Sequence, residues 1–351
     1  NNPTFFDHNT ELRGAVLTPD RAARALVTAQ VFSLAGLCDP SQKLSFTDGN
    51  CARGVVFLIA GDNLFQTLLL NMVQYPDEKP LRSVQEDRPA WEMDDAFMPD
   101  REMPFGYLDY LTWQNRRILL QPEASDQGIV VREMTMGPGL RIDPTILDPM
   151  KHYRKDTKKG FLVRRFSESR ALWRDSAALL ALPDSEEDFA PLTIRWLREL
   201  VHTEHVLDTR HLYRYLALGM ANDQARVFFY RSERMPFPLA YLDEPQLVRR
   251  LRDATDAAEQ ARGQLWGAAR ALARFVLSPH AGTAQGHEPA REDLDSLVAY
   301  WDPERHFWAT LEQPFQRLVV DLPGAPDAAL AAWYETVQQV AWGALEKAVR
   351  Q

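Results

Sequence analysis

The sequence predicts an α+β protein, with a mixed α/β domain over residues 1–240 followed by a four-helix bundle over residues 241–351. The chain has 351 residues, more than the ~250–300 at which one hydrophobic core stops growing, so two domains are expected. Before residue 240, short strand-forming runs alternate with helical patterns, whereas later the helical patterns are long and consecutive. This change of pattern sets the predicted boundary.

The first part of the chain predicts a helix, a buried strand and a second helix, in that order. The first helix begins near Thr18, which can cap it, and Pro19 suits its first turn. A loop is expected over residues 38–54, and the run VVFLIAG that follows it is typical of a buried strand. A helix capped by Asp62 comes next and ends before Pro76.

The stretch HLYRYLALGMANDQARVFFYRSERMPFP, residues 211–238, is typical of a β-hairpin. Both arms are apolar, and the run VFFY in the second arm consists of strand-forming residues. Gly219 and the trio Asn222, Asp223 and Gln224 are turn residues. The predicted hairpin therefore carries an uncharged amide, that of Gln224, at or beside its tip.

Four amphipathic segments joined by short loops follow residue 243 and predict the bundle. In the first of them apolar residues recur every three or four positions, as on one face of a helix: Leu247, Leu251, Ala254, Ala258, Ala261, Leu265, Ala268, Leu272 and Val276.

Composition excludes several classes of protein. The net charge of −9 and a pI of about 5.5 argue against a protein that coats nucleic acid along its whole surface. Cys38 and Cys51 are the only cysteines, too few for a disulfide framework or a four-cysteine zinc site. No apolar run approaches the ~18 residues of a membrane span. We therefore expect a cytoplasmic protein with no membrane partner.

Motifs for catalysis are largely missing, since the sequence has no G-x-S-x-G elbow, Walker loop or G-x-G-x-x-G fingerprint. The stretch VHTEHVLDTRH places His202 and His205 on one helix face, with His211 nearby, and such a pair can hold a metal. It lacks the H-E-x-x-H arrangement. A protein that is not an enzyme and has no cofactor is expected; a metal-dependent hydrolase using these histidines is the alternative.

The strongest electrostatic feature is a basic run that begins at residue 151. Basic groups separated by aromatic residues suit a groove that follows phosphates and stacks bases, although a solvated loop and strand face would have the same composition. The candidate phosphate contacts are Lys151, Arg154, Lys155, Lys158 and Lys159, with Tyr153, Phe161 and Phe166 among and after them.

Read in order, several segments resemble the large subunit (CasA) of the type I-E CRISPR surveillance complex, Cascade. These are NNPTFFDHN, CARGVVFLIAGDNLFQTLLLNMVQYP, RPAW, GYLDYLTWQ, GMANDQARVFFYRSER and ERHFWATLEQPF. They run from residue 1 to about residue 315 in the family's order. The resemblance also implies a further N-terminal segment ahead of Asn1.

The resemblance implies a DNA-recognition subunit without catalytic activity. Such a subunit reads the protospacer-adjacent motif (PAM) of double-stranded target DNA, while CRISPR RNA pairs with the target. It wedges the duplex open to start R-loop formation and recruits a helicase-nuclease. The implied partners are other Cascade protein subunits, CRISPR RNA, the target DNA and that effector. A purely structural scaffold subunit is a further alternative.

Matching the family's segments to this sequence implies four groups of site residues. Gln224, flanked by Asn222 and Asp223, would be the wedge, because an amide can replace a base in the stack. The family's glycine turn falls at Gly36 and its basic finger near Arg132. The loop expected to reach the PAM contains Phe6, Asp7, His8 and Asn9.

Overall fold

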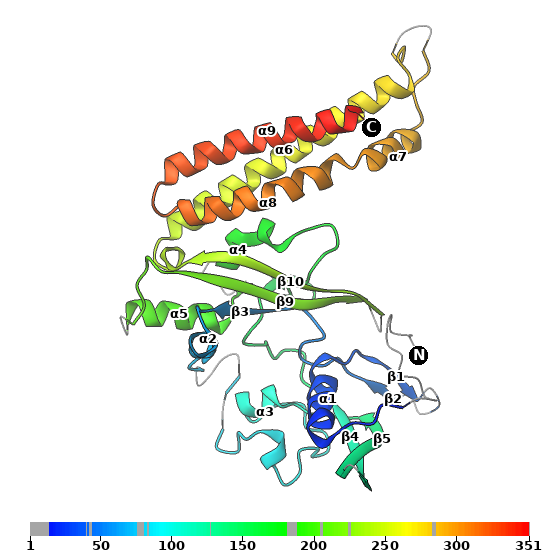
Figure 1. Cartoon of the computed structure of the whole chain (residues 1–351), viewed down its shortest axis with the longest axis vertical. Helices are drawn as coiled ribbons and strands as arrows, with labels where there is room; N and C mark the ends of the chain where they lie inside the picture. The colour runs from blue at the N-terminus through cyan, green and yellow to red at the C-terminus, as the bar shows by residue number, and fades with distance from the viewer. Residues whose placement is uncertain are drawn as a thin grey trace. The chain divides into compact units, whose positions relative to one another are not determined.

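Helices and strands mix up to residue 242 and helices alone follow it, which confirms the predicted α+β class (Figure 1). None of the helices in the described residues is both long and apolar enough to cross a membrane. The computed structural model describes residues 14–39, 41, 44–75, 81–82, 84–126, 128–180, 188–203, 206–223, 226–282 and 286–350.

Helix α1 (Pro19–Phe32) begins as predicted, with Thr18 at the N-cap and Pro19 in the first turn. The Thr18 hydroxyl donates to the Asp20 carboxylate at 2.5 Å and does not cap a backbone N–H. Helix α2 (Leu64–Asn71) starts one residue later than expected. Its cap is Asn63, whose side chain accepts the backbone N–H of Gln66 at 2.9 Å, so the prediction of Asp62 was wrong.

The region expected to be a loop contains a small antiparallel hairpin. Strand β1 (Gly36–Asp39) pairs with β2 (Leu44–Phe46). Its second strand packs against β5 (Gly128–Pro138), which itself pairs with β4 (Arg116–Ser125) along the whole length of β4. This tertiary support explains why strands form in a stretch rich in turn residues.

Arg116 joins α1, the β1–β2 hairpin and β4 through a fully buried side chain. Its guanidinium donates to the backbone oxygens of Leu34 (2.7 Å) and Thr47 (2.5 Å) and lies 4.5 Å from the ring centroid of Phe46. The Arg116 backbone N–H and C=O both bond to the Gln30 side chain. Burial lowers the pKa of the Arg116 guanidinium, and its Nη1 and Nη2 groups donate to backbone carbonyl oxygens.

A buried ion pair holds the loop ahead of α3 (Tyr107–Leu111). Arg101 pairs with Asp109, and neither side chain is more than 8% exposed. Asp109 also accepts the backbone N–H of Phe105 at 2.9 Å, and Arg101 donates to the backbone oxygen of Ala96 at 2.9 Å. The pair therefore fixes the path of the segment from residue 96 to residue 105.

The mixed region contains a three-stranded sheet in the order β10-β9-β3. Strand β3 (Val55–Ala60) confirms the predicted strand, and its residues alternate between buried and partly buried. Its partners β9 (Leu212–Asp223) and β10 (Arg226–Pro238) form the long hairpin. The remaining short elements are η1 (Ala90–Glu92), β6 (Tyr153–Asp156), β7 (Gly160–Val163), η2 (Leu172–Asp175), α4 (Ser176–Leu180), β8 (Asp188–Phe189), α5 (Leu192–His202) and η3 (Leu239–Leu242).

The C-terminal part contains four helices in the described residues, in agreement with the predicted bundle (Figure 1). Two of them follow each other after a single break, because Asp302 adopts a left-handed backbone conformation (φ 45°) just before Pro303. Both pack against the first and longest helix. The four are α6 (Pro245–Leu277), α7 (Arg291–Trp301), α8 (Pro303–Asp321) and α9 (Pro326–Arg350).

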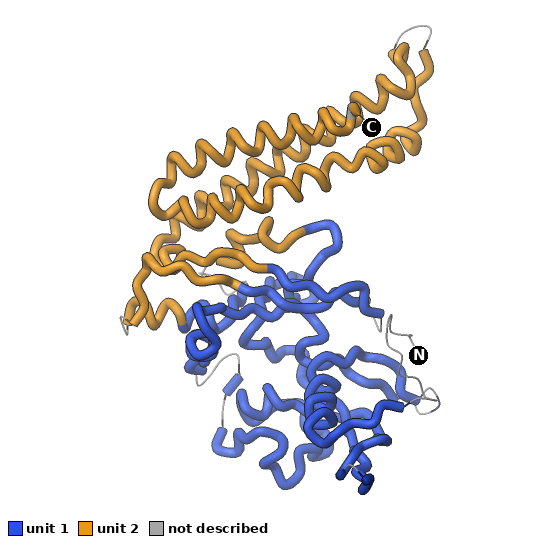
Figure 2. The backbone as a smooth tube through the Cα atoms, viewed as in Figure 1, with its two compact units in different colours: residues 1–170, 183–196, 216–233 blue, residues 171–182, 197–215, 234–351 orange. Residues whose placement is uncertain are grey.

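The chain divides into two compact units that alternate along the sequence (Figure 2). Within the second unit, Trp173 stacks on Phe315 of α8, and Arg174 pairs with Glu259 of α6 at 2.6 Å. Strand β9, strand β10 and helix α5 each contribute to both units. Unit 1 comprises residues 1–170, 183–196 and 216–233, and unit 2 comprises residues 171–182, 197–215 and 234–351.

Candidate functional site

Two regular strands of the long hairpin flank the predicted wedge in the sequence. Strand β9 ends at Asp223 and β10 begins at Arg226, so Gln224 lies in the two-residue connection outside the described residues. Asn222 and Asp223 are the last residues of β9. The backbone of the described arms therefore brings the chain to the position where the sequence predicts the tip.

Gly219 is in the middle of β9, so its assignment as a turn residue was wrong. A Cβ at this position would lie 2.9 Å from the backbone oxygen of Gly54, which precedes the neighbouring strand β3. Glycine is therefore needed for the close approach of two backbones and not for a turn. Gly54 itself has φ +80°, a conformation that favours glycine.

An exposed row of basic and aromatic side chains leads away from the tip along β10. Arg226, Phe228 and Tyr230 alternate with less exposed residues, and Tyr230 is 71% exposed. The Arg226 guanidinium lies 5.5 Å from the ring centroid of Phe228. Exposed rings beside a cation can stack bases and attract phosphates.

The basic run forms a second hairpin, made by β6 and β7. Asp156 accepts the backbone N–H groups of Lys158 and Lys159, each at 2.9 Å, and so fixes the turn between the strands. These bonds lower the pKa of the Asp156 carboxyl. The side chains of Arg154, Lys155, Lys158 and Lys159 are all exposed on this hairpin.

Lys151 does not belong with the exposed cations. Its side chain is 5% exposed, with the ammonium 3.2 Å from the Asp148 carboxylate and bonded to the backbone oxygen of Asn50. The expectation that it contacts phosphate is therefore corrected. The next residue, His152, is also buried; burial and the charge of Arg164 lower its pKa well below the ordinary 6.5.

The other predicted contacts are scattered over the first unit or lie outside the described residues. Gly36 begins β1, and a Cβ there would meet nothing within 4 Å, so its backbone is accessible. Arg132 on β5 forms an exposed ion pair with Glu123. The predicted PAM loop, Phe6, Asp7, His8 and Asn9, falls outside the described residues.

The histidines of the hydrolase alternative are not gathered into a metal cluster within the described part of the chain. His202 lies 3.4 Å from the Asp243 carboxylate, and the ring of His211 is 4.2 Å from that of Tyr213. His205 falls outside the described residues.

Comparison with known proteins decides the family. The model of the CRISPR-associated protein Cse1 family matches residues 1–344. This chain belongs to the Cse1 family. The resemblance to the large subunit CasA that the sequence indicates is thereby confirmed, since CasA and Cse1 name the same protein in the relative that follows.

This Cse1-family chain is similar to CasA/Cse1 of Thermus thermophilus, with 33% identity over 356 residues, or 97% of this chain and 66% of that protein. A crystal structure of Thermus thermophilus CasA shares the fold at a TM-score of 0.76 and 30% identity, over 97% of this chain and 69% of that one. A chain of a CRISPR RNA-guided surveillance complex shares the fold at a TM-score of 0.64 and 21% identity, over 97% and 70%. The chain thus spans about two thirds of the length of these relatives.

The exposed row Arg226, Phe228 and Tyr230 of this Cse1-family chain was not predicted from the sequence. The run VFFY was interpreted only as a strand-forming part of an apolar arm. A signal was present: the three residues occupy alternate positions and therefore share one face of a strand.

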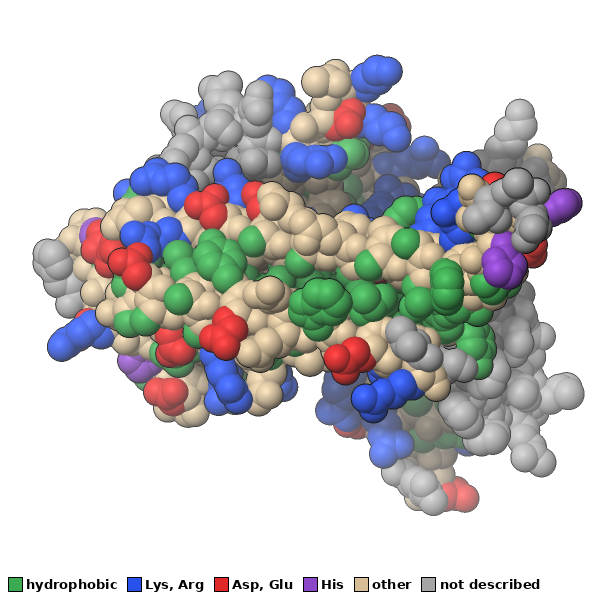
Figure 3. Space-filling model, turned by 90° about the horizontal axis from the view of Figure 1, so that it is seen from above, with side chains coloured by type: hydrophobic (Ala, Val, Ile, Leu, Met, Phe, Trp, Pro, Cys, Tyr) green, Lys and Arg blue, Asp and Glu red, His purple; other side chains and the backbone are tan. Residues whose placement is uncertain are grey.

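The bundle of this Cse1-family chain has an open apolar groove of about 480 Å³ between α6 and α9. Trp342 at the groove is 61% exposed. Hydrophobic side chains gather in a band over the bundle in Figure 3. Exposed apolar patches of this kind are typical of protein–protein contacts. The groove is lined by Ala257, Ala261, Gln264, Leu265, Ala268, Tyr334, Val337, Gln338, Ala341, Trp342 and Leu345.

Proposed function

We propose that this chain is the non-catalytic DNA-recognition subunit of a CRISPR surveillance complex, in which it reads the PAM of double-stranded DNA and starts strand separation. Membership of the Cse1 family supports the complex, with other protein subunits and CRISPR RNA as partners. The observation that carries DNA recognition is the β9–β10 hairpin, whose strands lead to Gln224 and carry Arg226, Phe228 and Tyr230 exposed beside it. Recruitment of a helicase-nuclease is part of the same proposal.

The proposal divides recognition between groups with different tasks. The loop from Phe6 to Asn9, Gly36 and Arg132 contact the PAM in the minor groove, where A·T and G·C pairs differ but little more can be read. The exposed cations of the β6–β7 hairpin contact phosphates, which position the duplex and carry no sequence information. Gln224 then occupies the space that the first opened base pair leaves.

Gln224→Ala should slow or weaken R-loop formation while binding of the PAM duplex persists. Opening the first base pair costs one stacking step, about 1.4 kcal/mol, before guide pairing compensates for it. The variant removes the amide that offsets this cost and leaves both strands of the hairpin unchanged. The measurement is the fluorescence of a base analogue placed beside the PAM, in the assembled complex.

The Gln224→Ala variant should open a target that is already mismatched beside the PAM as well as the wild type does. In such a target the first base pair is already open, so no stacking energy has to be supplied. Gln85→Ala, a change at an exposed glutamine in another turn of the first unit, is the matched control and should open both targets normally. Equal defects of Gln224→Ala on paired and mismatched targets would show that the residue merely supports the fold. Normal opening of both targets would contradict the wedge.

The β6–β7 hairpin gives a separate prediction about salt dependence. Lys158→Gln combined with Lys159→Gln should reduce the slope of log K against log salt by about 0.9 per lost phosphate contact. Good and bad PAMs should lose affinity equally. Arg24→Gln combined with Arg210→Gln removes the same charge from exposed residues that already pair with Asp20 and Asp208, and should leave the slope unchanged. A wild-type slope in the lysine variant would show that this hairpin is only a solvated face.

A structural scaffold is the second candidate function, and the groove between α6 and α9 favours it. A scaffold would hold partner proteins through its bundle and take no part in reading DNA. It predicts that the complex binds duplexes with good and bad PAMs equally, whereas the recognition subunit predicts a clear preference.

A further inference from the structure

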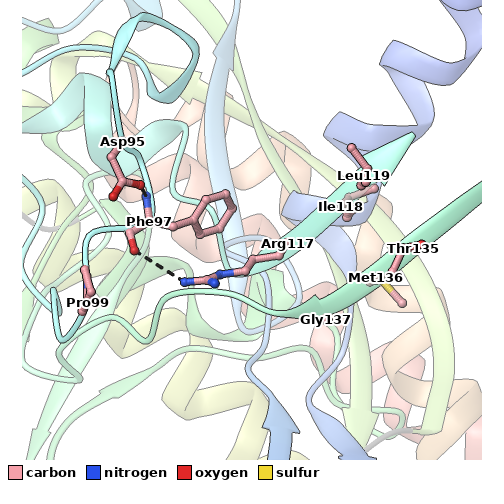
Figure 4. Close-up of a pocket in the computed structure, with 9 residues that line it drawn as sticks. All are labelled: Asp95, Phe97, Pro99, Arg117, Ile118, Leu119, Thr135, Met136 and Gly137. Carbon is pink, nitrogen blue, oxygen red and sulfur yellow. Dashed lines mark hydrogen bonds between the residues drawn. The ribbon is translucent and has the colours of Figure 1, made fainter. Parts of the chain in front are cut away.

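A second open cavity lies in the first unit, against the two-stranded β4–β5 sheet (Figure 4). Its volume is about 680 Å³, within the range of roughly 300–1,000 Å³ that is usual for small-molecule sites. The lining residues come from the strands and from the segment that Arg101 fixes. They are Asp95, Phe97, Pro99, Arg117, Ile118, Leu119, Thr135, Met136 and Gly137.

The pairing of the strands explains why the cavity is open. Arg117 is directly opposite Gly137, and Leu119 is opposite Thr135, so all four residues share one face of the sheet. Gly137 contributes no side chain there, and a Cβ at its position would meet nothing within 4 Å. Its φ is not in the left-handed region. Gly137 therefore leaves a space that a side chain could fill without backbone strain.

Arg117 extends from β4 toward the loop of Phe97 (Figure 4). Its guanidinium lies 4.9 Å from the ring centroid of Phe97 and 3.5 Å from the Phe97 backbone oxygen. Both partners are neutral. Arg132 on the same sheet is paired with Glu123, whereas Arg117 makes no ion pair within the described part of the chain.

Asp95 is the other charged residue of the lining, and its carboxylate has a structural task. It accepts the backbone N–H of Phe97 at 2.8 Å, which orients the loop that carries the ring. The cavity thus combines one guanidinium without an ion pair in the described residues, one oriented aromatic ring and the apolar side chain of Leu119. A guanidinium fork matches a phosphate, and an aromatic ring stacks any base.

We propose that this cavity binds one unpaired nucleotide of single-stranded DNA, with its phosphate on Arg117 and its base against Phe97 and the apolar wall. The inference rests on the proposed function, because strand opening is what supplies an unpaired strand. It adds a site distinct in position from the hairpin tip. Stacking tolerates every base, so the cavity holds the strand without reading its sequence.

The test uses the full chain and fluorescein-labelled dT12, with binding followed by fluorescence anisotropy. Gly137→Leu fills the cavity and leaves every charge in place, Phe97→Leu removes the ring, and Arg117→Gln removes the cation. Each should weaken binding roughly 5- to 100-fold, the range expected for loss of one stacked base. Arg24→Gln, which removes an exposed arginine paired with Asp20, should bind dT12 like the wild type. Unchanged thermal unfolding of the variants confirms that they are folded.

The site is overturned if the wild type does not bind dT12, or if Gly137→Leu binds dT12 like the wild type. A loss confined to Arg117→Gln also overturns it, because that pattern describes a surface phosphate contact and not a nucleotide cavity. Measuring the PAM preference of the assembled complex distinguishes failure of the cavity proposal from failure of the proposed function. A wild-type complex that ignores the PAM contradicts DNA recognition; one that prefers the correct PAM while Gly137→Leu binds dT12 normally contradicts only the cavity.

Discussion

Replacing Arg116 with methionine should lower the free energy of unfolding by about 2–6 kcal/mol. The change leaves two partly buried carbonyl oxygens, those of Leu34 and Thr47, without the Arg116 donor. A buried polar group that loses its only partner costs about 1–3 kcal/mol. Methionine keeps much of the apolar volume, so the loss comes mainly from hydrogen bonds. Urea denaturation measures it as a lower midpoint at an unchanged m-value.

The neighbouring Arg117→Met is the matched control for Arg116→Met. Arg117 is exposed and its guanidinium lies against Phe97, so the control should leave the urea midpoint close to the wild-type value. Equal shifts for both variants would contradict a special role of the buried guanidinium. A specific loss in Arg116→Met would show that α1, the β1–β2 hairpin and β4 depend on one side chain.

Asp109→Asn should destabilise the protein by about 3–5 kcal/mol, since it leaves the buried guanidinium of Arg101 without its counter-charge. The amide keeps the size of the carboxylate and an oxygen that can accept the Phe105 N–H. The loss therefore reports charge and not packing. The urea midpoint measures it, and Asp20→Asn, which breaks an exposed ion pair with Arg24, is the control and should leave the midpoint unchanged.

Adding Arg101→Met to Asp109→Asn should recover part of the lost stability, because the double variant no longer buries an uncompensated charge. A double variant with a lower free energy of unfolding than Asp109→Asn alone would contradict this explanation. Arg101 also bonds the backbone of Ala96, next to Phe97 of the proposed nucleotide cavity. Asp109→Asn should therefore weaken dT12 binding as well.

The elements that were predicted correctly are those whose sequence signal is local. Strand β3 is an uninterrupted apolar run, and the bundle helices repeat apolar residues every three or four positions. Such periodicity follows from the geometry of one element and needs no knowledge of its neighbours. The start of α1 at Pro19 is local in the same sense.

The errors share a different cause, since each depends on contacts that exist only in the folded chain. Lys151 is buried because Asp148 and the backbone of Asn50 compensate its charge. Gly219 is needed because Gly54 of another segment lies against it. The cap of α2 could not be assigned from residue type, because Asp62 and Asn63 are adjacent and suit an N-cap equally well. Only the observed hydrogen bond from the Gln66 backbone N–H to Asn63 distinguishes them.

In the candidate site, too, the features with a local sequence pattern were predicted and those that depend on tertiary contacts were not. The sequence indicated the hairpin and its polar connection, because strand-forming arms around turn residues are a local pattern. It did not indicate the cavity at Arg117, which exists only because β4, β5 and the loop of Phe97 come together. Gly137 showed no sign of importance until strand pairing placed it opposite Arg117.

The alternation of the two units along the chain has a consequence for how this protein can be divided. The predicted boundary at residue 240 marks the start of the bundle. A cut there would separate the bundle from residues 171–182 and 197–215, which belong to the same unit. Trp173 would lose Phe315, and Arg174 would lose Glu259. The bundle is therefore not a module that evolution could add, lose or exchange in one step. Chimeras between relatives should succeed only when residues 171–182 and 197–215 travel with residues 234–351.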